Sequence, residues 1–458
     1  MAKQPATVYE CSECGWSTGK WMGRCARCGS WGTLDQHSPA APSAAPAALA
    51  PTSPAQPITS VPATAARKIP TGVSELDRVL GGGLVPGAVI LLAGEPGVGK
   101  STLLLDVAAK AARAAARLGR APVLYISGEE SASQVRLRGE RIGAMDEHLL
   151  LASESDIGRA LGHIENARPS LLIVDSVQTL ADAEVAGTAG GPAQVRAVTA
   201  ALVSVAKTHG LPVVLVGHVT KDGSIAGPRV LEHLVDVVCQ FEGDKHSRLR
   251  LVRAVKNRYG ATDEVGCFEL TESGIVGLPD PSGLFLSARD HTVPGTCVSM
   301  TLEGRRPMPV EVQGLVVPSS GRPQRTNSGV LSARVAMMVA VLQSRLGLSL
   351  DQKDIFVSTV GGAQASEPAA DAAIALALAS AYMDLPLAPG VIAIGEVALT
   401  GELRPVTGLP QRLNEAARLG FTLAIVPERT DSSKLPAGIR VQRCADIRQA
   451  LEAVLPTG

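Results

Sequence analysis

The sequence lacks any charge-free run of about 20 apolar residues, the length that a membrane-spanning helix needs. Its N-terminal stretch, MAKQPATVYE, also lacks the apolar core of a secretory signal. We therefore expect a cytoplasmic protein with no membrane partner. Net charge is absent too, because 43 Lys and Arg balance 43 Asp and Glu, so the total charge gives no indication about nucleic acid.

Cysteine is scarce outside one short segment. Four of the eight cysteines lie between residues 11 and 28, and the others are scattered through apolar or strand-like stretches. This distribution does not fit a disulfide framework. It is typical of a cytosolic protein with one metal site and isolated thiols.

The clustered cysteines form two pairs with CxxC spacing, Cys11 with Cys14 and Cys25 with Cys28. Thiolate pairs at this spacing can close a tetrahedral Zn²⁺ site, which supplies folding energy that so small a module lacks. A redox-active CxxC motif is the alternative, but two matched pairs without an adjacent βαβ unit argue against it. We predict a structural Zn²⁺ ion held by these four cysteines.

All three tryptophans of the chain lie in or beside this module, interleaved with cations. The residues concerned are Trp16, Trp21, Trp31, Lys20, Arg24 and Arg27. Aromatic rings with cations suit base stacking and phosphate contact. The same rings can instead fill a module that has almost no core, and the sequence leaves both interpretations open.

A length of 458 residues exceeds one compact core, so two or three domains are expected. Composition divides the chain into a four-Cys zinc-binding module (1–36), a disordered linker rich in Ala and Pro (37–66), a first α/β domain (67–280) and a second domain (281–458). The linker is predicted to be disordered because it is uncharged and offers too little apolar surface to bury.

Strand-like apolar runs at 88–94, 122–128, 171–175 and 212–218 alternate with amphipathic stretches such as 101–119. Strands that alternate with helices predict an α/β fold with a parallel sheet covered on both faces. Further helical and strand-like runs after Pro281 predict a separate α/β or α+β domain.

Residues 94–101, GEPGVGKS, match the pattern G-x-x-x-x-G-K-S/T between an apolar strand and a helix. In this context the glycines allow backbone N–H groups to converge on nucleotide phosphates, and the helix N-terminus adds its positive end. Lys100 is expected to reach the β and γ phosphates of ATP, and Ser101 to ligate Mg²⁺. The predicted ATP and ADP contacts are Gly94, Glu95, Pro96, Gly97, Val98, Gly99, Lys100, Ser101 and Thr102.

Carboxylates follow two of the predicted strands. The run LLIVD ends in Asp175, which we expect to hold Mg²⁺ together with Ser101. Two glutamates follow the run PVLYISG, and either one could polarise the attacking water. Spacing alone does not distinguish Glu129 from Glu130.

The run TGVSELDRVLGGGLVPGAVILLAGEPGVGKST (71–102) resembles the start of the RecA/DnaB-type ATPase core. The segment KNRYG (256–260) resembles the KNRFG motif that marks the bacterial RadA (Sms) recombination and repair proteins. The resemblance covers essentially the whole chain. It implies a RecA-like P-loop ATPase core, preceded by a zinc-binding module and followed by a Lon-protease-like α/β domain.

The resemblance also implies roles for single residues. Glu129 matches the family's water-activating glutamate. Lys256 and Arg258 match a paired basic finger that DnaB-type ring ATPases insert into a neighbouring subunit's nucleotide site, where it stabilises charge on the transferring phosphoryl. Without the family match, these two residues would be taken for a solvated basic turn after the strand-like run 248–255.

By the same resemblance, mobile loops facing the centre of a ring are expected to grip DNA. The candidates are the Gly-rich segments 181–196 and 218–233. The expected DNA contacts are Lys221, Arg229, Lys256 and Arg258. Gln178 and His218 follow or end strands, where they could sense the γ-phosphate or relay DNA contact.

The C-terminal region resembles the Lon proteolytic domain but lacks its catalytic pair. SEPAAD (366–371) takes the place of Lon's nucleophile segment D-G-P-S-A-G, which puts Ala369 at the serine position. PVTGLPQR (405–412) corresponds to the segment P-I-G-G-L-K-E-K, with Pro410 and Arg412 at the lysine positions. Alanine has no nucleophile and arginine keeps its proton, so we expect no peptidase activity. The role left to this domain is ring assembly and DNA contact.

Together these features predict a Mg²⁺-dependent ATPase that acts as a helicase-type motor on single-stranded and branched DNA, and the resemblance implies that it forms a homo-hexamer. The resemblance implies branch migration of strand-exchange products in double-strand break repair, association with the nucleoid, and a RecA-type recombinase as partner. Two alternatives are a KaiC-type regulatory nucleotide switch and an ATP-dependent protease, and Ala369 argues against the second.

Overall fold

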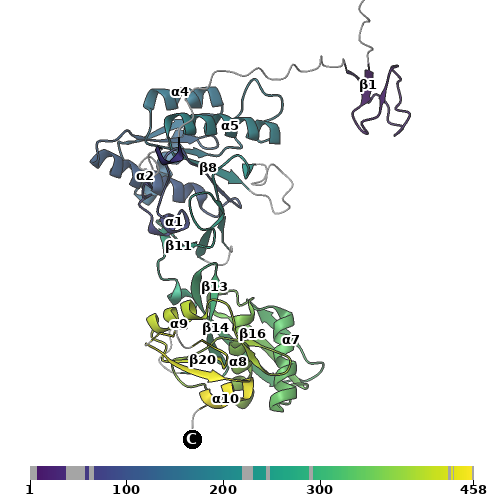
Figure 1. The fold of residues 1–458 in the computed structure, drawn as a ribbon, viewed down its shortest axis with the longest axis vertical. Helices are drawn as coiled ribbons and strands as arrows, with labels where there is room; N and C mark the ends of the chain where they lie inside the picture. Colours follow the sequence, from purple (N-terminus) through teal and green to yellow (C-terminus); the bar gives the residue numbers. More distant parts are fainter. Residues whose placement is uncertain are drawn as a thin grey trace, which may run out of the picture. The chain divides into compact units, whose positions relative to one another are not determined.

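The computed structural model describes residues 8–37, 57–60, 67–218, 231–243, 248–287, 292–431, 435–436 and 438–455 (Figure 1). The chain forms two compact units, residues 1–63 and residues 64–458. No helix within the described ranges is long and apolar enough to cross a membrane.

The small unit is built on a three-stranded antiparallel sheet in the order β2-β1-β3. Its strands are β1 (Val8–Cys11), β2 (Ser17–Thr18) and β3 (Leu34–His37). Its buried core consists of Cys11, Cys25 and Leu34, with a few half-buried side chains around them. Inside the predicted linker, residues 57–60 contain the 3-10 turn η1 (Ile58–Ser60), and the rest of residues 38–66 lies outside the described ranges.

The large unit begins with a nine-stranded sheet in the order β12-β11-β10-β9-β4-β8-β7-β5-β6. Its strands are β4 (Val89–Gly94), β5 (Val123–Ser127), β6 (Leu149–Ser153), β7 (Leu171–Asp175), β8 (Val213–His218), β9 (Val237–Glu242), β10 (Leu249–Asn257), β11 (Val265–Thr271) and β12 (Gly274–Gly277). Strands β9, β4, β8, β7, β5 and β6 are parallel, and β10 to β12 continue the sheet antiparallel. The predicted parallel sheet is confirmed, with an antiparallel extension that was not foreseen.

Helices cover both faces of this sheet, as the alternation of runs predicts. One face carries α1 (Ser74–Val79), α2 (Lys100–Arg117) and α3 (Ala132–Ile142), and the other carries α4 (Ile157–Ala167) and α5 (Pro192–His209) (Figure 1). Within β4, Ile90 and Leu92 pack into the first layer, and Leu91 and Ala93 into the second. Because successive side chains of a strand point to opposite faces, two covered faces require the continuous apolar runs seen in the sequence.

The second sheet has seven strands in the order β15-β16-β14-β13-β17-β20-β21. They are β13 (Thr296–Glu303), β14 (Arg306–Pro318), β15 (Arg325–Ser328), β16 (Lys353–Thr359), β17 (Val391–Ala393), β20 (Leu423–Pro427) and β21 (Arg440–Cys444). A separate ribbon joins β18 (Glu396–Val397) to β19 (Leu403–Arg404), so the run 391–397 is divided between two strands.

Helices also cover both faces of this second sheet. Helices α7 (Ser332–Val341), α8 (Asp371–Met383) and α10 (Ile447–Val454) pack on one face, and α9 (Leu409–Arg418) on the other. Short helical turns are η3 (Ser282–Leu284), η4 (Leu342–Leu346), η5 (Val360–Gly362) and η6 (Pro368–Ala370). Helix α8 is buried along nearly its whole length, which agrees with its run of Ala, Leu and Ile.

The hairpin of β13 and β14 joins the two sheets. At its tip, a Cβ on Gly304 would lie 2.2 Å from the carbonyl oxygen of Asp263, so only glycine fits there. Arg305 pairs with the Asp263 carboxylate at 3.1 Å, and Arg306 donates to the buried carboxylate of Glu75 on α1. The two α/β parts therefore share one compact unit.

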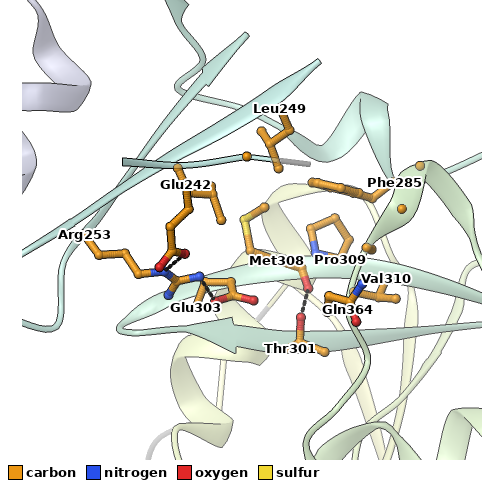
Figure 2. A pocket seen from close by; sticks show the side chains of 15 residues that line it. Glu242, Leu249, Arg253, Phe285, Thr301, Glu303, Met308, Pro309, Val310 and Gln364 are labelled. Carbon is orange, nitrogen blue, oxygen red and sulfur yellow. Dashed lines mark hydrogen bonds and ion pairs between the residues drawn. The ribbon is translucent and has the colours of Figure 1, made fainter. Parts of the chain in front are cut away.

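A cavity of about 400 Å³ lies beside this hairpin, between β9, β10 and the second sheet (Figure 2). Its lining is mostly apolar and includes Leu249 and Phe285. The guanidinium of Arg253 lies between two carboxylates, 3.2 Å from Glu242 and 2.5 Å from Glu303. The pair between Arg253 and Glu303 ties the first sheet to the end of β13. Of the residues that line the cavity, none belongs to the phosphate loop.

Candidate ATP site and zinc centre

The phosphate loop connects the end of β4 to the first turn of α2, as the sequence predicts. Two of its positions require glycine. A Cβ on Gly94 would lie 2.4 Å from the carbonyl oxygen of Phe241, and one on Gly99, whose φ is 109°, would lie 2.3 Å from Cδ1 of Ile275. At Gly97 a Cβ would meet no described atom within 4 Å, so the loop is open to a ligand on that side.

Lys100 is the first residue of α2, and its side chain folds back over the loop. Its Nζ donates to the carbonyl oxygens of Gly94 and Glu95, both at 2.8 Å. Burial lowers the pKa of Lys100 to about 8, although the charges of Asp175 and Glu129 act in the opposite direction. We refer to Lys100 and the two carboxylates whose charges act on it, Asp175 and Glu129, as the phosphate-loop cluster. A nucleotide phosphate would give this buried ammonium a full counter-charge, so the loop suits a polyphosphate.

Asp175 ends β7, next to the end of β5. Its buried carboxylate accepts a 2.5 Å hydrogen bond from the hydroxyl of Tyr125. Burial, together with the charge of Asp175, raises the pKa of Tyr125 well above its usual value, so this hydroxyl remains a donor. The carboxylate of Asp175 and the hydroxyl of Ser101 are hard oxygen ligands of the kind that Mg²⁺ prefers.

The structure separates the two glutamates that spacing could not. The Oε1 atom of Glu129 accepts a hydrogen bond from Ser176 at 2.8 Å and lies 3.0 Å from Nε2 of His218. Glu130 instead pairs with Arg138 of α3 at 2.5 Å. Glu129 is therefore the glutamate that faces the ends of β7 and β8, where the phosphate-loop cluster lies.

Two polar atoms beside Glu129 are buried without a hydrogen-bond partner among the described residues, namely Nδ1 of His218 and Oε1 of Gln178. The Gln178 side chain donates to the carbonyl oxygen of His218 at 3.4 Å. The chain after His218, residues 219–230, lies outside the described ranges, and so do the predicted DNA contacts Lys221 and Arg229. Sensing by Gln178 and His218 stays a prediction.

Lys256 and Arg258 lie at the end of β10, and Lys256 is part of the strand rather than of a turn. The Nζ of Lys256 donates to the carbonyl oxygens of Glu232 and Val235, the latter at 2.9 Å. Nη1 of Arg258 pairs with Oδ1 of Asp236 at 3.1 Å. Both basic side chains thus bind the segment that leads into β9.

Four polar residues of the site were not foreseen, namely Tyr125, Ser176, Asp236 and Arg250. Arg250 is buried on β10, and its Nε donates to the carbonyl oxygen of Val98 at 3.2 Å, which supports the phosphate loop from the side. All four lie within a strand or directly beside one, and a polar residue in such a position can be recognised in the sequence as a candidate site residue. Their contacts depend on the strand order, which sequence does not show.

The four predicted zinc ligands lie together, and all their sulfur atoms are within 4.8 Å of one another. The Sγ atoms of Cys11 and Cys28 are 3.7 Å apart, as are those of Cys14 and Cys25. A thiolate tetrahedron with Zn–S bonds of about 2.3 Å has edges of about 3.8 Å, so these residues fit Zn²⁺. A Zn²⁺ ion held by these four cysteines would be structural, because no open position would be left.

The tryptophans of the small unit have different surroundings. Trp16 packs on the cysteine core, whereas Trp21 and Trp31 are 64% and 75% exposed. The guanidinium of Arg24 lies 5.8 Å from the centroid of the Trp31 ring, within cation–π range. Two of the three rings therefore do not fill the core, which leaves them free for a ligand.

Three family models match parts of the chain. They are the AAA domain over residues 54–224, the rubredoxin metal binding domain over 9–36 and the Lon protease (S16) C-terminal proteolytic domain over 330–457. A DNA repair protein RadA from Mycolicibacterium smegmatis is 55% identical over 455 residues, which cover 97% of this chain and 96% of the relative. The chain belongs to the RadA family.

Other members of the RadA family match over similar lengths. DNA repair protein RadA from Mycobacterium tuberculosis is 53% identical over 449 residues, covering 97% of this chain and 92% of the relative. That from Streptococcus pyogenes is 42% identical over 458 residues, covering 99% and 100%. The resemblance first indicated by KNRYG is confirmed, as is the fold class of an α/β ATPase core between a zinc ribbon and a Lon-like domain.

In this RadA-family chain the Lon-like region has a buried ion pair near the position of the missing nucleophile. Ala369 is 1% exposed, and its methyl group provides no nucleophile. Arg412 is fully buried and binds Glu367 through two hydrogen bonds, at 2.6 and 2.8 Å. Ser366 is exposed, three residues from the nucleophile position. The guanidinium of Arg412 is therefore already paired and cannot act as a base, and the absence of peptidase activity stays a prediction.

Proposed function

We propose that this chain is a DNA-dependent ATPase of helicase type. It binds single-stranded DNA and processes recombination intermediates, promoting branch migration of strand-exchange products in double-strand break repair. The observation that carries the proposal is the phosphate-loop cluster of Lys100, Asp175 and Glu129 in a chain that also has the KNRYG segment. The printed name of its relatives, DNA repair protein RadA, supports the repair context.

The hydrolytic step uses side chains whose surroundings are described above. Lys100 exchanges its two carbonyl contacts for the β and γ phosphates and balances their charge. Ser101 and Asp175 would hold Mg²⁺, whose charge would help to neutralise the phosphates. Glu129 orients the attacking water and accepts its proton, while Ser176 and His218 fix the position of the Glu129 carboxylate.

The basic pair completes the site from a neighbouring subunit. Arg258 and Lys256 contact the segment before β9 in their own chain, and the side chain of Arg258 is 55% exposed. A cation supplied in trans stabilises the charge that develops on the γ-phosphoryl. This arrangement requires a head-to-tail interface, which closes into a ring when the rotation allows it. We therefore include the homo-hexamer in the proposal, with a recombinase partner and a cytoplasmic, nucleoid-associated location.

The deciding experiment is steady-state ATP hydrolysis with and without single-stranded DNA at two salt concentrations. Lys100→Ala is the inactive reference. Stimulation by DNA that fades as salt rises supports a motor that grips the phosphate backbone. Hydrolysis that ignores DNA refutes the motor and favours a KaiC-type nucleotide switch, and digestion of casein by the intact protein would revive the protease.

A further inference from the structure

Asp236 is a buried carboxylate that the proposed mechanism has not used. It lies directly before β9 and is 2% exposed. Its Oδ2 accepts the backbone N–H of Val89 at 3.0 Å and the Nζ of Lys207 at 2.7 Å, and its Oδ1 accepts Nη1 of Arg258 at 3.1 Å. One carboxylate therefore joins the start of β4, the end of α5 and the basic pair.

The carboxylate is held firmly and stays ionised. Burial by itself raises the pKa of Asp236, but the bonds from Lys207 and the N–H of Val89, with the charge of Arg258, bring it below its ordinary value. Two of its three donors come from regular elements, so its oxygens cannot rotate freely. A buried anion with a fixed orientation is a suitable support for a mobile cation.

The contact with Arg258 holds one side of the guanidinium and leaves the rest accessible. Only Nη1 is bonded to Asp236, and the side chain is 55% exposed. Nearby, Lys256 is bound to the carbonyl oxygens of Glu232 and Val235, which fixes the end of β10. Arg258 can therefore keep its bond to Asp236 and still offer N–H groups to a phosphate, because the guanidinium has five of them.

We propose that Asp236 is the positioning residue of the basic pair, presenting Arg258 to the nucleotide of the neighbouring subunit. The inference rests on the proposed function, in which Arg258 acts in trans. The same carboxylate holds the N–H at the start of β4, the strand that ends in the phosphate loop. Asp236 thus fixes Arg258 to the central strand of its own sheet, as geometric control of a catalytic cation requires.

The test uses mixed oligomers, because a cation supplied in trans can be rescued by a different subunit. Asp236→Asn keeps the shape of the side chain and removes its charge, and we expect it to lower kcat about 10-fold to 100-fold with little change in KM. Lys100→Ala inactivates its own site but keeps Asp236 and Arg258. In a 1:1 mixture, an interface is active when an Asp236→Asn subunit supplies the site and a Lys100→Ala subunit supplies the cation. In randomly assembled oligomers about a quarter of all interfaces have this composition, so about a quarter of the normal rate should return.

Arg258→Gln mixed with Lys100→Ala is the reference, and Asp280→Asn is the matched control. Asp280 pairs with Arg418 at 3.0 Å in an exposed position, so its loss should leave the rate unchanged. All rates are expressed per folded subunit, so that unfolded protein does not count. Rescue of both Asp236→Asn and Arg258→Gln supports the inference.

Four other outcomes decide against it in different ways. Rescue of Arg258→Gln without rescue of Asp236→Asn overturns the positioning role and leaves the proposed function standing. Failure to rescue Arg258→Gln refutes the cation in trans, and the inference falls with it. An Asp236→Asn protein with normal kcat, or one that binds no nucleotide, also overturns the positioning role, because Asp236 would then serve nothing or only its own fold.

Discussion

A buried ion pair between Glu75 of α1 and Arg306 of β14 connects the two α/β parts of the large unit. Glu75 is 1% exposed and also accepts the backbone N–H of Cys267 at 2.9 Å, and the side chain of Arg306 is 9% exposed. Arg306→Met would remove the buried cation of this carboxylate and leave only Arg78, whose side chain is 45% exposed and lies 3.5 Å away. Breaking a buried pair in this way costs about 3–5 kcal/mol. The lower end, about 3 kcal/mol, is expected because the N–H of Cys267 and the half-exposed Arg78 remain to stabilise the charge.

Urea unfolding followed by far-ultraviolet circular dichroism measures this loss as a lower midpoint. Arg305→Met is the matched control, since Arg305 pairs with Asp263 on the same hairpin but the two side chains are 63% and 50% exposed. Its loss should cost at most about 1 kcal/mol. The double variant Glu75→Gln with Arg306→Met should be more stable than Arg306→Met alone, because no unpaired charge stays buried. Equal losses for Arg305→Met and Arg306→Met, or additive losses in the double variant, would refute the reasoning.

Three further predictions concern the nucleotide and zinc sites. The pKa of Lys100 without ligand is about 8, and a bound phosphate favours the charged form of its side chain. Binding of a fluorescent ATP analogue should therefore be constant below pH 8 and weaken up to about tenfold per pH unit above it. Lys100→Arg should show no such decline, because arginine keeps its charge. Glu129→Gln should lower kcat about 100-fold or more while nucleotide binding is retained, and Glu130→Gln should hydrolyse ATP near the normal rate. The opposite ranking of the two variants would assign activation of the water to Glu130. Cys28→Ala should release zinc to a chelating dye and leave ATP hydrolysis in the absence of DNA intact, because the zinc-binding unit is compact by itself. Loss of hydrolysis would show that the large unit depends on the zinc-binding unit.

Local signals were enough to locate the phosphate loop and the zinc ligands. Gly94 and Gly99 are required by contacts within a strand–loop–helix unit, and the cysteine spacing places four sulfur atoms together. Strand order, in contrast, decides the long-range contacts. That Glu129 and not Glu130 faces His218 depends on β5, β7 and β8 being neighbours.

Other contacts lay beyond sequence reasoning because they join distant segments. Asp236 meets Arg258 and Val89 only because β9 lies between β10 and β4. Likewise, the hairpin tip at Gly304 contacts Asp263 through the packing of one sheet on another, for which the chain carries no periodic signal.

The small unit contains every tryptophan of the chain, and the large unit contains none. Light that only the indole ring absorbs therefore excites residues of the zinc unit and no others. Because Trp21 and Trp31 are exposed, their emission should shift in colour or be quenched when a base or a protein surface covers them. Ligands that bind only the large unit should leave this emission unchanged. The protein thus carries a built-in optical probe, without any label, that tells which of its two units a partner touches.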